Sequence, residues 1–171
     1  MKVVLVGYMA SGKSSLGKAL AEELGLKFID LDHYIEEQQQ RTVQEIFQES
    51  GEIFFRKLEH QLLLKILKEK DSLLLSTGGG TPCYGSNMDA ILQYADHSLY
   101  LQLPVASLVE RIAKEKEQRP LVRDLSTNEL AEFVGKHLFE RRQFYTKATK
   151  TLSCNGKSIP ELAEEAKKEL L

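Results

Sequence analysis

Two cysteines and no tryptophan occur among the 171 residues, and no apolar run is long enough to cross a bilayer. Cys83 and Cys154 form no CxxC pair, and no histidine lies at metal-ligand spacing from them, which argues against a disulfide framework or a zinc site. The apolar start from Met1 to Val6 is interrupted by Gly7 and is too short for a signal peptide. We therefore expect a cytoplasmic protein with free thiols and no membrane association.

An excess of charge of either sign is also missing. The 23 Lys and Arg residues nearly balance the 25 Asp and Glu residues, giving a net charge of −2. This balance argues against bulk nucleic-acid binding, although a small basic pocket for an anion is compatible with it. The length and the 42% hydrophobic and 28% charged composition predict one globular domain over residues 1–171.

Short apolar runs alternate with longer amphipathic patterns along the chain. The runs 3–6, 27–30, 73–76, 98–101 and 151–154 are predicted strands. The segments 13–24, 33–50, 52–70, 88–94, 105–116, 127–147 and 159–170 are predicted helices. Three Ser or Thr residues followed three positions later by Glu fit a capping box, at 42, 126 and 158. This alternation predicts a parallel sheet covered by helices, with ligands bound at the carboxyl ends of its strands.

The first predicted strand leads into Gly7-Tyr8-Met9-Ala10-Ser11-Gly12-Lys13-Ser14, which matches GxxxxGK[ST] at every fixed position. In such a loop, glycines let backbone N–H groups face phosphate oxygens, the lysine reaches the β/γ-phosphates and the hydroxyl ligates Mg²⁺. A glycine-rich turn that only caps a helix is the alternative. The strand before the motif and the amphipathic helix after it favour nucleotide binding. The predicted ATP contacts in this loop are Gly7, Met9, Ala10, Ser11, Gly12, Lys13, Ser14 and Ser15.

Asp30 and Asp32 follow the second predicted strand and are expected at the same sheet edge as the phosphate loop. One carboxylate could serve the metal and the other the phosphoryl acceptor. Asp32 could equally cap the helix predicted from His33, and the two roles are compatible.

Other polar groups become informative only if they converge. Glu52, Arg56 and Glu59 share a helix face, which in isolation indicates a solvated surface with intrahelical ion pairs. Three consecutive glycines, 78–80, end the third strand and suggest either a flexible loop or a close approach of backbone to a ligand. Arg119, Arg141 and Arg142 are of the type favoured for phosphate and carboxylate.

These features occur in a distinctive order. They are the phosphate loop, Phe28-x-Asp30-x-Asp32, Gly51-Glu52-x-x-Phe55-Arg56-x-x-Glu59, Gly78-Gly79-Gly80, Arg119-Pro120-Leu121 and an Arg four residues before Tyr145. From Gly7 to Tyr145 the set resembles the shikimate kinase family. The phosphate loop alone would indicate only nucleotide binding, whereas the other elements separate this family from gluconate and adenylate kinases.

The resemblance implies a P-loop nucleoside-monophosphate-kinase fold with a five-stranded parallel sheet in the order 2-3-1-4-5. It implies a single kinase domain with a substrate-binding region at about 32–60 and a mobile lid at about 114–124. The implied activity is ATP-dependent phosphorylation of the shikimate 3-hydroxyl, a step of aromatic amino acid synthesis, by a monomer. A kinase for another small hydroxy acid, such as gluconate, is the alternative.

The resemblance also implies residue roles. Lys13, Asp32 and Arg119 would be catalytic, with Arg119 also contacting ATP from the lid. Ser14 and Asp30 would serve Mg²⁺, with Asp30 acting through water.

Arg56, Glu59, Gly78, Gly79, Gly80 and Arg141, together with Asp32, would bind shikimate. Within that set, Arg56 and Arg141 would clamp the carboxylate and Glu59 would orient Arg56. Gln143 stands where the family has Pro, so Arg142 remains an alternative clamp. The adenine contacts, for which Arg111 and the region near Asn155 are candidates, stay unassigned.

Overall fold

The computed structural model describes every residue from Met1 to Leu171 and contains one five-stranded parallel sheet in the order β2-β3-β1-β4-β5. This confirms the strand order that the family resemblance implies. The strands are β1 (Lys2–Val6), β2 (Phe28–Asp30), β3 (Leu73–Ser76), β4 (His97–Gln102) and β5 (Lys150–Ser153). The helices are α1 (Lys13–Leu24), α2 (Leu31–Gln39), α3 (Val43–Glu69), α4 (Asn87–Tyr94), α5 (Val105–Lys114), α6 (Thr127–Tyr145) and α7 (Ile159–Leu170). Two short 3₁₀ turns are η1 (Thr81–Cys83) and η2 (Lys116–Gln118).

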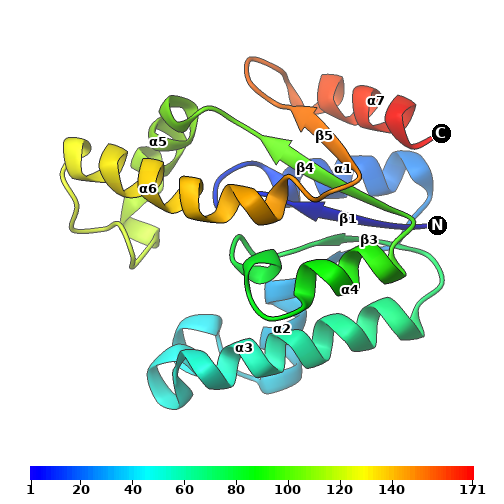
Figure 1. Ribbon diagram of the computed structural model, residues 1–171, viewed down its shortest axis with the longest axis horizontal. Helices are drawn as coiled ribbons and strands as arrows, with labels where there is room; N and C mark the ends of the chain where they lie inside the picture. The colour runs from blue at the N-terminus through cyan, green and yellow to red at the C-terminus, as the bar shows by residue number, and fades with distance from the viewer.

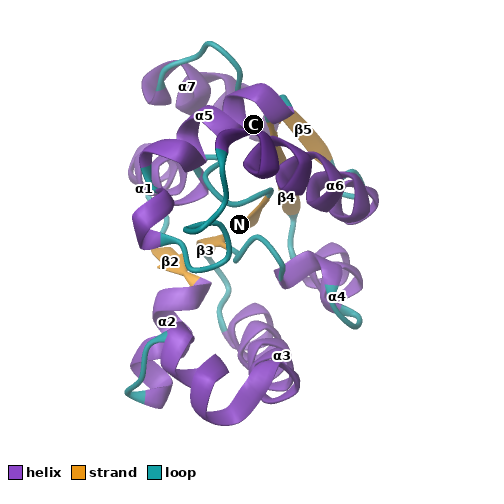
Figure 2. Cartoon of the chain, turned by 90° about the vertical axis from the view of Figure 1, so that its left-hand side faces the viewer, coloured by secondary structure: helices purple, strands orange, loops and turns teal.

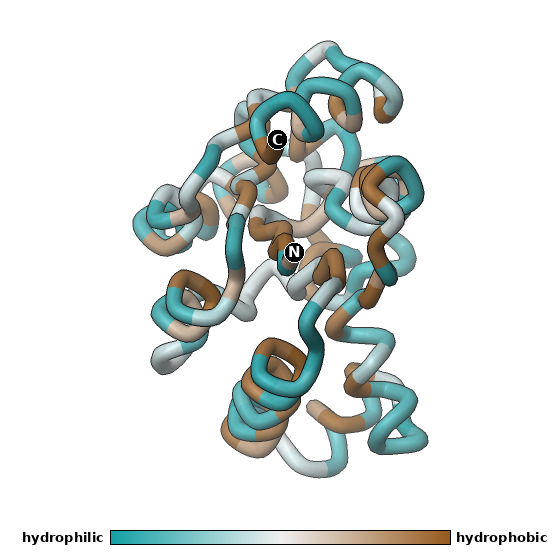
Figure 3. Tube along the Cα trace, turned by 90° about the vertical axis from the view of Figure 1, so that its right-hand side faces the viewer, coloured by the Kyte–Doolittle hydropathy of each residue, from teal (hydrophilic) through white to brown (hydrophobic).

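The central strands are buried because helices cover both faces of the sheet. Residues 3–6 of β1 and 73–75 of β3 have no exposed surface, which explains their unbroken apolar character. Right-handed crossovers place α1 and α7 against each other on one face and α3, α4 and α6 on the other (Figure 1). Along the peripheral helices hydrophobic and hydrophilic stretches alternate, while the termini lie together at one end of the molecule (Figure 3).

The predicted helix 33–50 is wrong as a single element. α2 ends at Gln39, Gln40 takes a left-handed φ of 54°, and Thr42 starts α3 with a complete capping box to Glu45. At Gly51, φ is 84° and ψ is 171°, so α3 is kinked between its segments 43–50 and 52–69. The capping box at Thr42 therefore predicted the helix boundary correctly, whereas the apolar periodicity continued across it.

The other two expected capping boxes have different outcomes. Ser158 and Glu161 form both reciprocal hydrogen bonds at the start of α7, which confirms the prediction. At α6 the Ser126 side chain accepts from the Glu129 N–H, but its hydroxyl, not its backbone N–H, donates to the Glu129 carboxylate. The α6 start is thus capped from one side only.

No helix combines the length and the apolar character that a membrane crossing requires. Both cysteines, Cys83 and Cys154, are free thiols.

The phosphate-loop helix α1 approaches β2 closely at Gly17. A Cβ on this glycine would lie 2.5 Å from Phe28 Cε2 and 3.3 Å from Leu74 Cδ2. The contact leaves no room for a side chain and sets the distance between α1 and the strand that carries Asp30.

We expect Gly17→Ala to lower the free energy of unfolding by about 1–3 kcal/mol, because the methyl group overpacks this contact. Gly135→Ala is a matched control in another helix, since a Cβ there meets no atom within 4 Å. Because Gly135→Ala replaces a glycine within a helix, it should leave the free energy of unfolding unchanged or raise it by up to about 1 kcal/mol. Urea denaturation measures both, and equal effects of the two variants would contradict the packing argument.

Candidate active site

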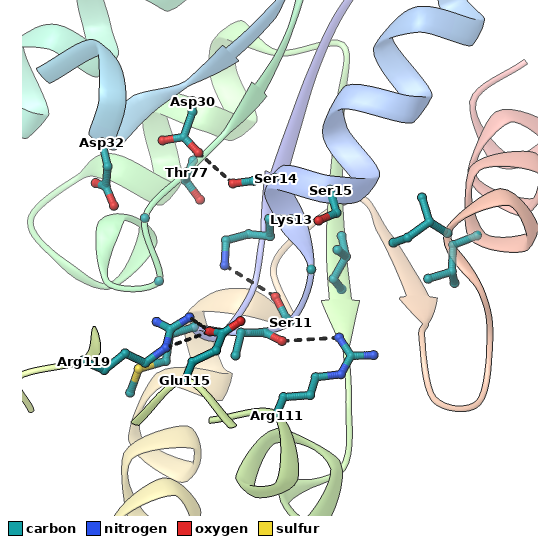
Figure 4. A pocket seen from close by; sticks show the side chains of 18 of the residues that line it. Ser11, Lys13, Ser14, Ser15, Asp30, Asp32, Thr77, Arg111, Glu115 and Arg119 are labelled. Carbon is teal, nitrogen blue, oxygen red and sulfur yellow. Dashed lines mark hydrogen bonds and ion pairs between the residues drawn. The ribbon is translucent and has the colours of Figure 1, made fainter. Parts of the chain in front are cut away.

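A polar cavity of about 670 Å³, called the main cavity below, lies at the carboxyl ends of the strands, as parallel sheets favour. That end of the sheet faces the viewer in Figure 2. The wall is built from the phosphate loop and the start of α1, Asp30 and Asp32, Thr77 to Gly79, the region of Arg111 to Arg119, and Lys157 to Leu162 (Figure 4). Segments distant in the sequence therefore converge on one site.

The phosphate loop is shaped by backbone conformations that a helix cannot contain. Gly12 precedes α1 with φ 94° and ψ 16°, and Ala10 has a left-handed φ of 63°, uncommon for a residue with a side chain. Lys13 Nζ donates to the carbonyl oxygens of Gly7 at 2.7 Å and Tyr8 at 2.9 Å. Burial lowers the pKa of Lys13 to about 8, while the charge of Asp32 acts in the opposite direction.

Ser14 and Asp30 meet at the start of α1. Ser14 Oγ donates to Asp30 Oδ2 at 2.7 Å, and Asp30 Oδ1 accepts from the His33 N–H at 3.1 Å. Asp30, rather than Asp32, therefore caps α2, which corrects the capping alternative considered for Asp32.

Asp32 lies in the first turn of α2, not in an extended segment, yet it still lines the cavity with Asp30. The pKa of Asp32 is raised to about 6, mainly by loss of contact with water and additionally by the nearby Asp30 and Glu59 carboxylates. A Cβ on Gly78 would lie 3.0 Å from Asp32 Oδ1, so this glycine gives the carboxylate its space.

Two guanidinium groups meet over Gly80. A Cβ there would lie 2.9 Å from Arg56 Nη2 and 3.2 Å from Arg141 Nη2. Arg56 is held on one edge by Glu59, at 2.9 Å, and on its face by the Tyr84 ring, 3.8 Å from the guanidinium carbon to the ring centroid.

Arg142 is directed elsewhere. It is exposed and lines a separate cavity of about 350 Å³ with Tyr100 and Ser153. Between the two neighbouring arginines, the structure brings Arg141 to the glycine loop.

Arg119 reaches the main cavity from the segment after η2. Its Nη2 and Nε donate to Glu115 Oε2 at 2.7 and 3.2 Å, a pair visible beneath Lys13 in Figure 4. The pair is local and exposed, and such pairs contribute little stability.

The predicted residues thus fall into two groups. The cavity wall contains Met9, Ala10, Ser11, Gly12, Lys13, Ser14, Ser15, Asp30, Asp32, Gly78, Gly79 and Arg119. Arg56, Glu59, Gly80 and Arg141 gather beyond Gly79, and Gly7 contributes its carbonyl oxygen to Lys13. Arg142, the alternative clamp residue, is absent from both groups and lines a different cavity.

The sequence analysis did not assign several residues that the structure places at the site. Arg111, left unassigned, donates from Nη1 to the Ala10 carbonyl at 3.3 Å and lines the cavity, as does Lys157. Thr77 Oγ1 donates to the Leu5 carbonyl at 2.9 Å and anchors the glycine loop to β1. The only feature of the sequence that could have indicated a role for Thr77 is its hydroxyl group directly after a buried strand.

Helix α6 contacts both loops through one face, with residues spaced four apart. His137 Nδ1 and the Tyr8 hydroxyl are hydrogen-bonded at 2.9 Å, and Tyr145 donates from its hydroxyl to the Gly79 carbonyl at 2.5 Å. Arg141 lies between them on the same face. The two contacts therefore fix the position of Arg141 relative to the phosphate loop.

Comparison with known proteins decides the family. The family model described as shikimate kinase matches residues 9–171. A curated shikimate kinase of Flavobacterium psychrophilum is 48% identical over 168 residues, covering 98% of this chain and 97% of that protein. The chain belongs to the shikimate kinase family. Membership confirms the predicted ATP-dependent phosphoryl transfer to shikimate with Mg²⁺, and no match supports gluconate.

Solved shikimate kinases have the same fold. The crystal structure of the Bacteroides thetaiotaomicron enzyme matches with a TM-score of 0.93 at 35% identity, covering 99% of this chain and 98% of that one. The Acinetobacter baumannii shikimate kinase, solved in complex with shikimate, matches with a TM-score of 0.87 at 30% identity, covering 99% and 92%. These matches support the P-loop kinase fold over the whole chain.

The environment of Asp32 leads to a titration prediction. We expect its carboxyl group to titrate near pH 6 in ¹³C NMR, about two units above an ordinary aspartate. Asp30→Asn removes a neighbouring negative charge and should lower that value. An Asp32 pKa near 4 in the unmodified protein would contradict the burial argument.

Proposed function

We propose that the protein transfers the γ-phosphoryl group of ATP to the 3-hydroxyl of shikimate, with ATP in the main cavity and shikimate between Asp32 and the paired guanidinium groups. The observation that carries this proposal is the convergence of Arg56 and Arg141 at Gly80, one glycine beyond the cavity wall. Two cations at one point suit a carboxylate. They place the acid-binding end of the acceptor at Gly80, in the same glycine loop that borders Asp32 at Gly78.

Ser14 and Asp30 fit the Mg²⁺ that the reaction uses. They present a hydroxyl and a carboxylate oxygen 2.7 Å apart beside the phosphate loop, and oxygen donors suit this cation. When bound, Mg²⁺ neutralises phosphate charge. It commonly needs only one or two protein carboxylates because substrate phosphates and water complete its shell.

Asp32 accepts the hydrogen of the acceptor hydroxyl in this proposal. The hydroxyl oxygen forms a bond to the γ-phosphorus as the bond from phosphorus to the β–γ bridging oxygen breaks, and ADP leaves. The released proton passes to the Asp32 carboxylate. A pKa of about 6 leaves Asp32 ionised at pH 7 but more basic than an ordinary aspartate.

Lys13 and Arg119 supply positive charge to the transferring group. Lys13 is held by two carbonyl oxygens, so its ammonium group is oriented before the nucleotide arrives. Arg119 can exchange its exposed Glu115 partner for phosphate as the segment 114–124 closes. Closure would also exclude water from the reacting phosphate.

We propose further that residues 1–171 work as one kinase domain, with the acceptor region at 32–60, and that it is monomeric and cytoplasmic. All the groups assigned above come from one chain, so the proposed chemistry requires no residue of a second subunit. Size-exclusion chromatography with light scattering tests the oligomeric state.

A coupled assay for ADP with ATP, Mg²⁺ and shikimate tests the activity directly. We expect shikimate-dependent turnover, and Lys13→Ala and Asp32→Ala should each lower kcat by at least about 100-fold. Circular dichroism should show that both variants remain folded. Gluconate in place of shikimate should give no turnover, and its efficient use would overturn the proposed acceptor.

The assignment of the clamp is tested by two adjacent residues. Arg141→Ala and Arg56→Ala should each raise the KM for shikimate at least about tenfold, because each removes a charged hydrogen-bond donor to the carboxylate. Arg142→Ala is the matched control and should leave that KM within about twofold. A larger effect at Arg142 than at Arg141 would reverse the assignment.

The pH dependence follows from Asp32. Its pKa is raised, so the carboxylate is lost as pH falls through about 6, and kcat/KM for shikimate should fall with it. Stopped assays across pH 5–8, with ATP saturating, measure this limb. A profile that is flat to pH 5 would exclude Asp32 as the proton acceptor.

A further inference from the structure

A chain of buried hydrogen bonds runs from α4 to the Arg56 guanidinium. Asn87 Nδ2 donates to the Thr81 carbonyl at 2.9 Å, and Thr81 Oγ1 donates to Glu59 Oε2 at 2.9 Å. The other Glu59 oxygen accepts from Arg56 Nη1 at 2.9 Å. His60 Nδ1 lies 2.6 Å from Asn87 Oδ1 and closes the far end of the chain.

The burial of this chain is unusual for polar groups. Glu59 is 1% exposed, Thr81 0% and Asn87 1%, so water cannot replace any of the three as a partner. Buried polar groups without partners are costly, and a buried carboxylate especially so. Glu59 therefore depends on Thr81 for one oxygen and on Arg56 for the other.

We propose that Thr81 and, behind it, Asn87 are positioning residues for the carboxylate clamp. Thr81 fixes the rotamer of Glu59, and Glu59 in turn holds Arg56 so that Nη2 faces Gly80. Asn87 fixes the Thr81 backbone and with it the end of the glycine loop. The proposal deepens the proposed function, because it rests on Arg56 gripping the carboxylate of the acceptor.

The position of these hydrogen bonds explains why their loss should affect the binding of shikimate but not of ATP. Thr81 and Asn87 lie behind the clamp, and neither forms a hydrogen bond with the phosphate loop. Their one hydrogen bond to the main cavity wall is made by the backbone, where the Thr81 N–H donates to the Gly78 carbonyl at 3.2 Å, and it does not involve the Thr81 hydroxyl. Loss of the Thr81 hydroxyl should thus misplace Arg56 without disturbing Lys13 or Ser14. Removal of the Thr81 hydroxyl should therefore weaken recognition of the acid and leave nucleotide binding unchanged.

The decisive variants are Thr81→Val, which replaces the hydroxyl with a methyl group of similar size, and Thr81→Ser, which keeps the hydroxyl. Calorimetry on the whole protein should show shikimate binding weakened at least about tenfold in Thr81→Val and within about twofold of normal in Thr81→Ser. The KM for ATP should stay unchanged in both. Thr81→Ala deletes the same hydroxyl with less bulk, so the measurement does not depend on the Val variant folding.

The methyl ester of shikimate separates positioning from general damage. The ester lacks the charge that Arg56 grips, so Thr81→Val should lower kcat/KM for the acid far more than for the ester. The acid-to-ester preference should therefore collapse. Equal losses on acid and ester, or normal shikimate binding by Thr81→Val, would overturn the inference. An unmodified protein that binds no shikimate would instead overturn the proposed function.

Discussion

The loops that follow β1 and β3 pack so closely that a side chain at Gly79 would require one of them to shift. Leu5 of β1 pairs with Ser76 of β3, and Thr77 donates twice to the Leu5 carbonyl, from its N–H at 3.2 Å and its hydroxyl at 2.9 Å. A Cβ on Gly79 would then lie 3.2 Å from the Met9 nitrogen. Donor and acceptor sites are consequently positioned by the register of two neighbouring strands, and phosphoryl transfer depends most on such positioning.

Two arginines of the site form ion pairs with glutamates. Arg56 pairs with Glu59 and Arg119 with Glu115, but the two pairs differ in burial. Glu59 is 1% exposed and its second oxygen accepts from Thr81, whereas Glu115 is half exposed. A rigid pair suits recognition of a constant feature such as a carboxylate. An exposed local pair suits a group that must change partners during the reaction.

Local sequence signals were sufficient for the class of fold and the phosphate loop, whereas the strand order came from the family resemblance. Unbroken apolar runs between amphipathic patterns gave a parallel sheet, and the GxxxxGKS motif located Lys13 and Ser14. The errors arose where two local signals competed. Apolar periodicity crossed the capping box at Thr42, and two aspartates two residues apart could each cap α2, a role that Asp30 takes.

The remaining features depend on contacts between distant segments. Arg141 and Arg142 point about 100° apart around a helix, so only the packing of α6 could decide between them. That packing is fixed by Tyr8 and Gly79, which lie 129 and 66 residues away from their partners on α6. Thr81 and Asn87 are likewise ordinary residues until the fold buries them behind Glu59. The local motif thus locates the phosphate loop, whereas the proposed recognition of the acid depends on how α3, α4 and α6 meet around one glycine loop.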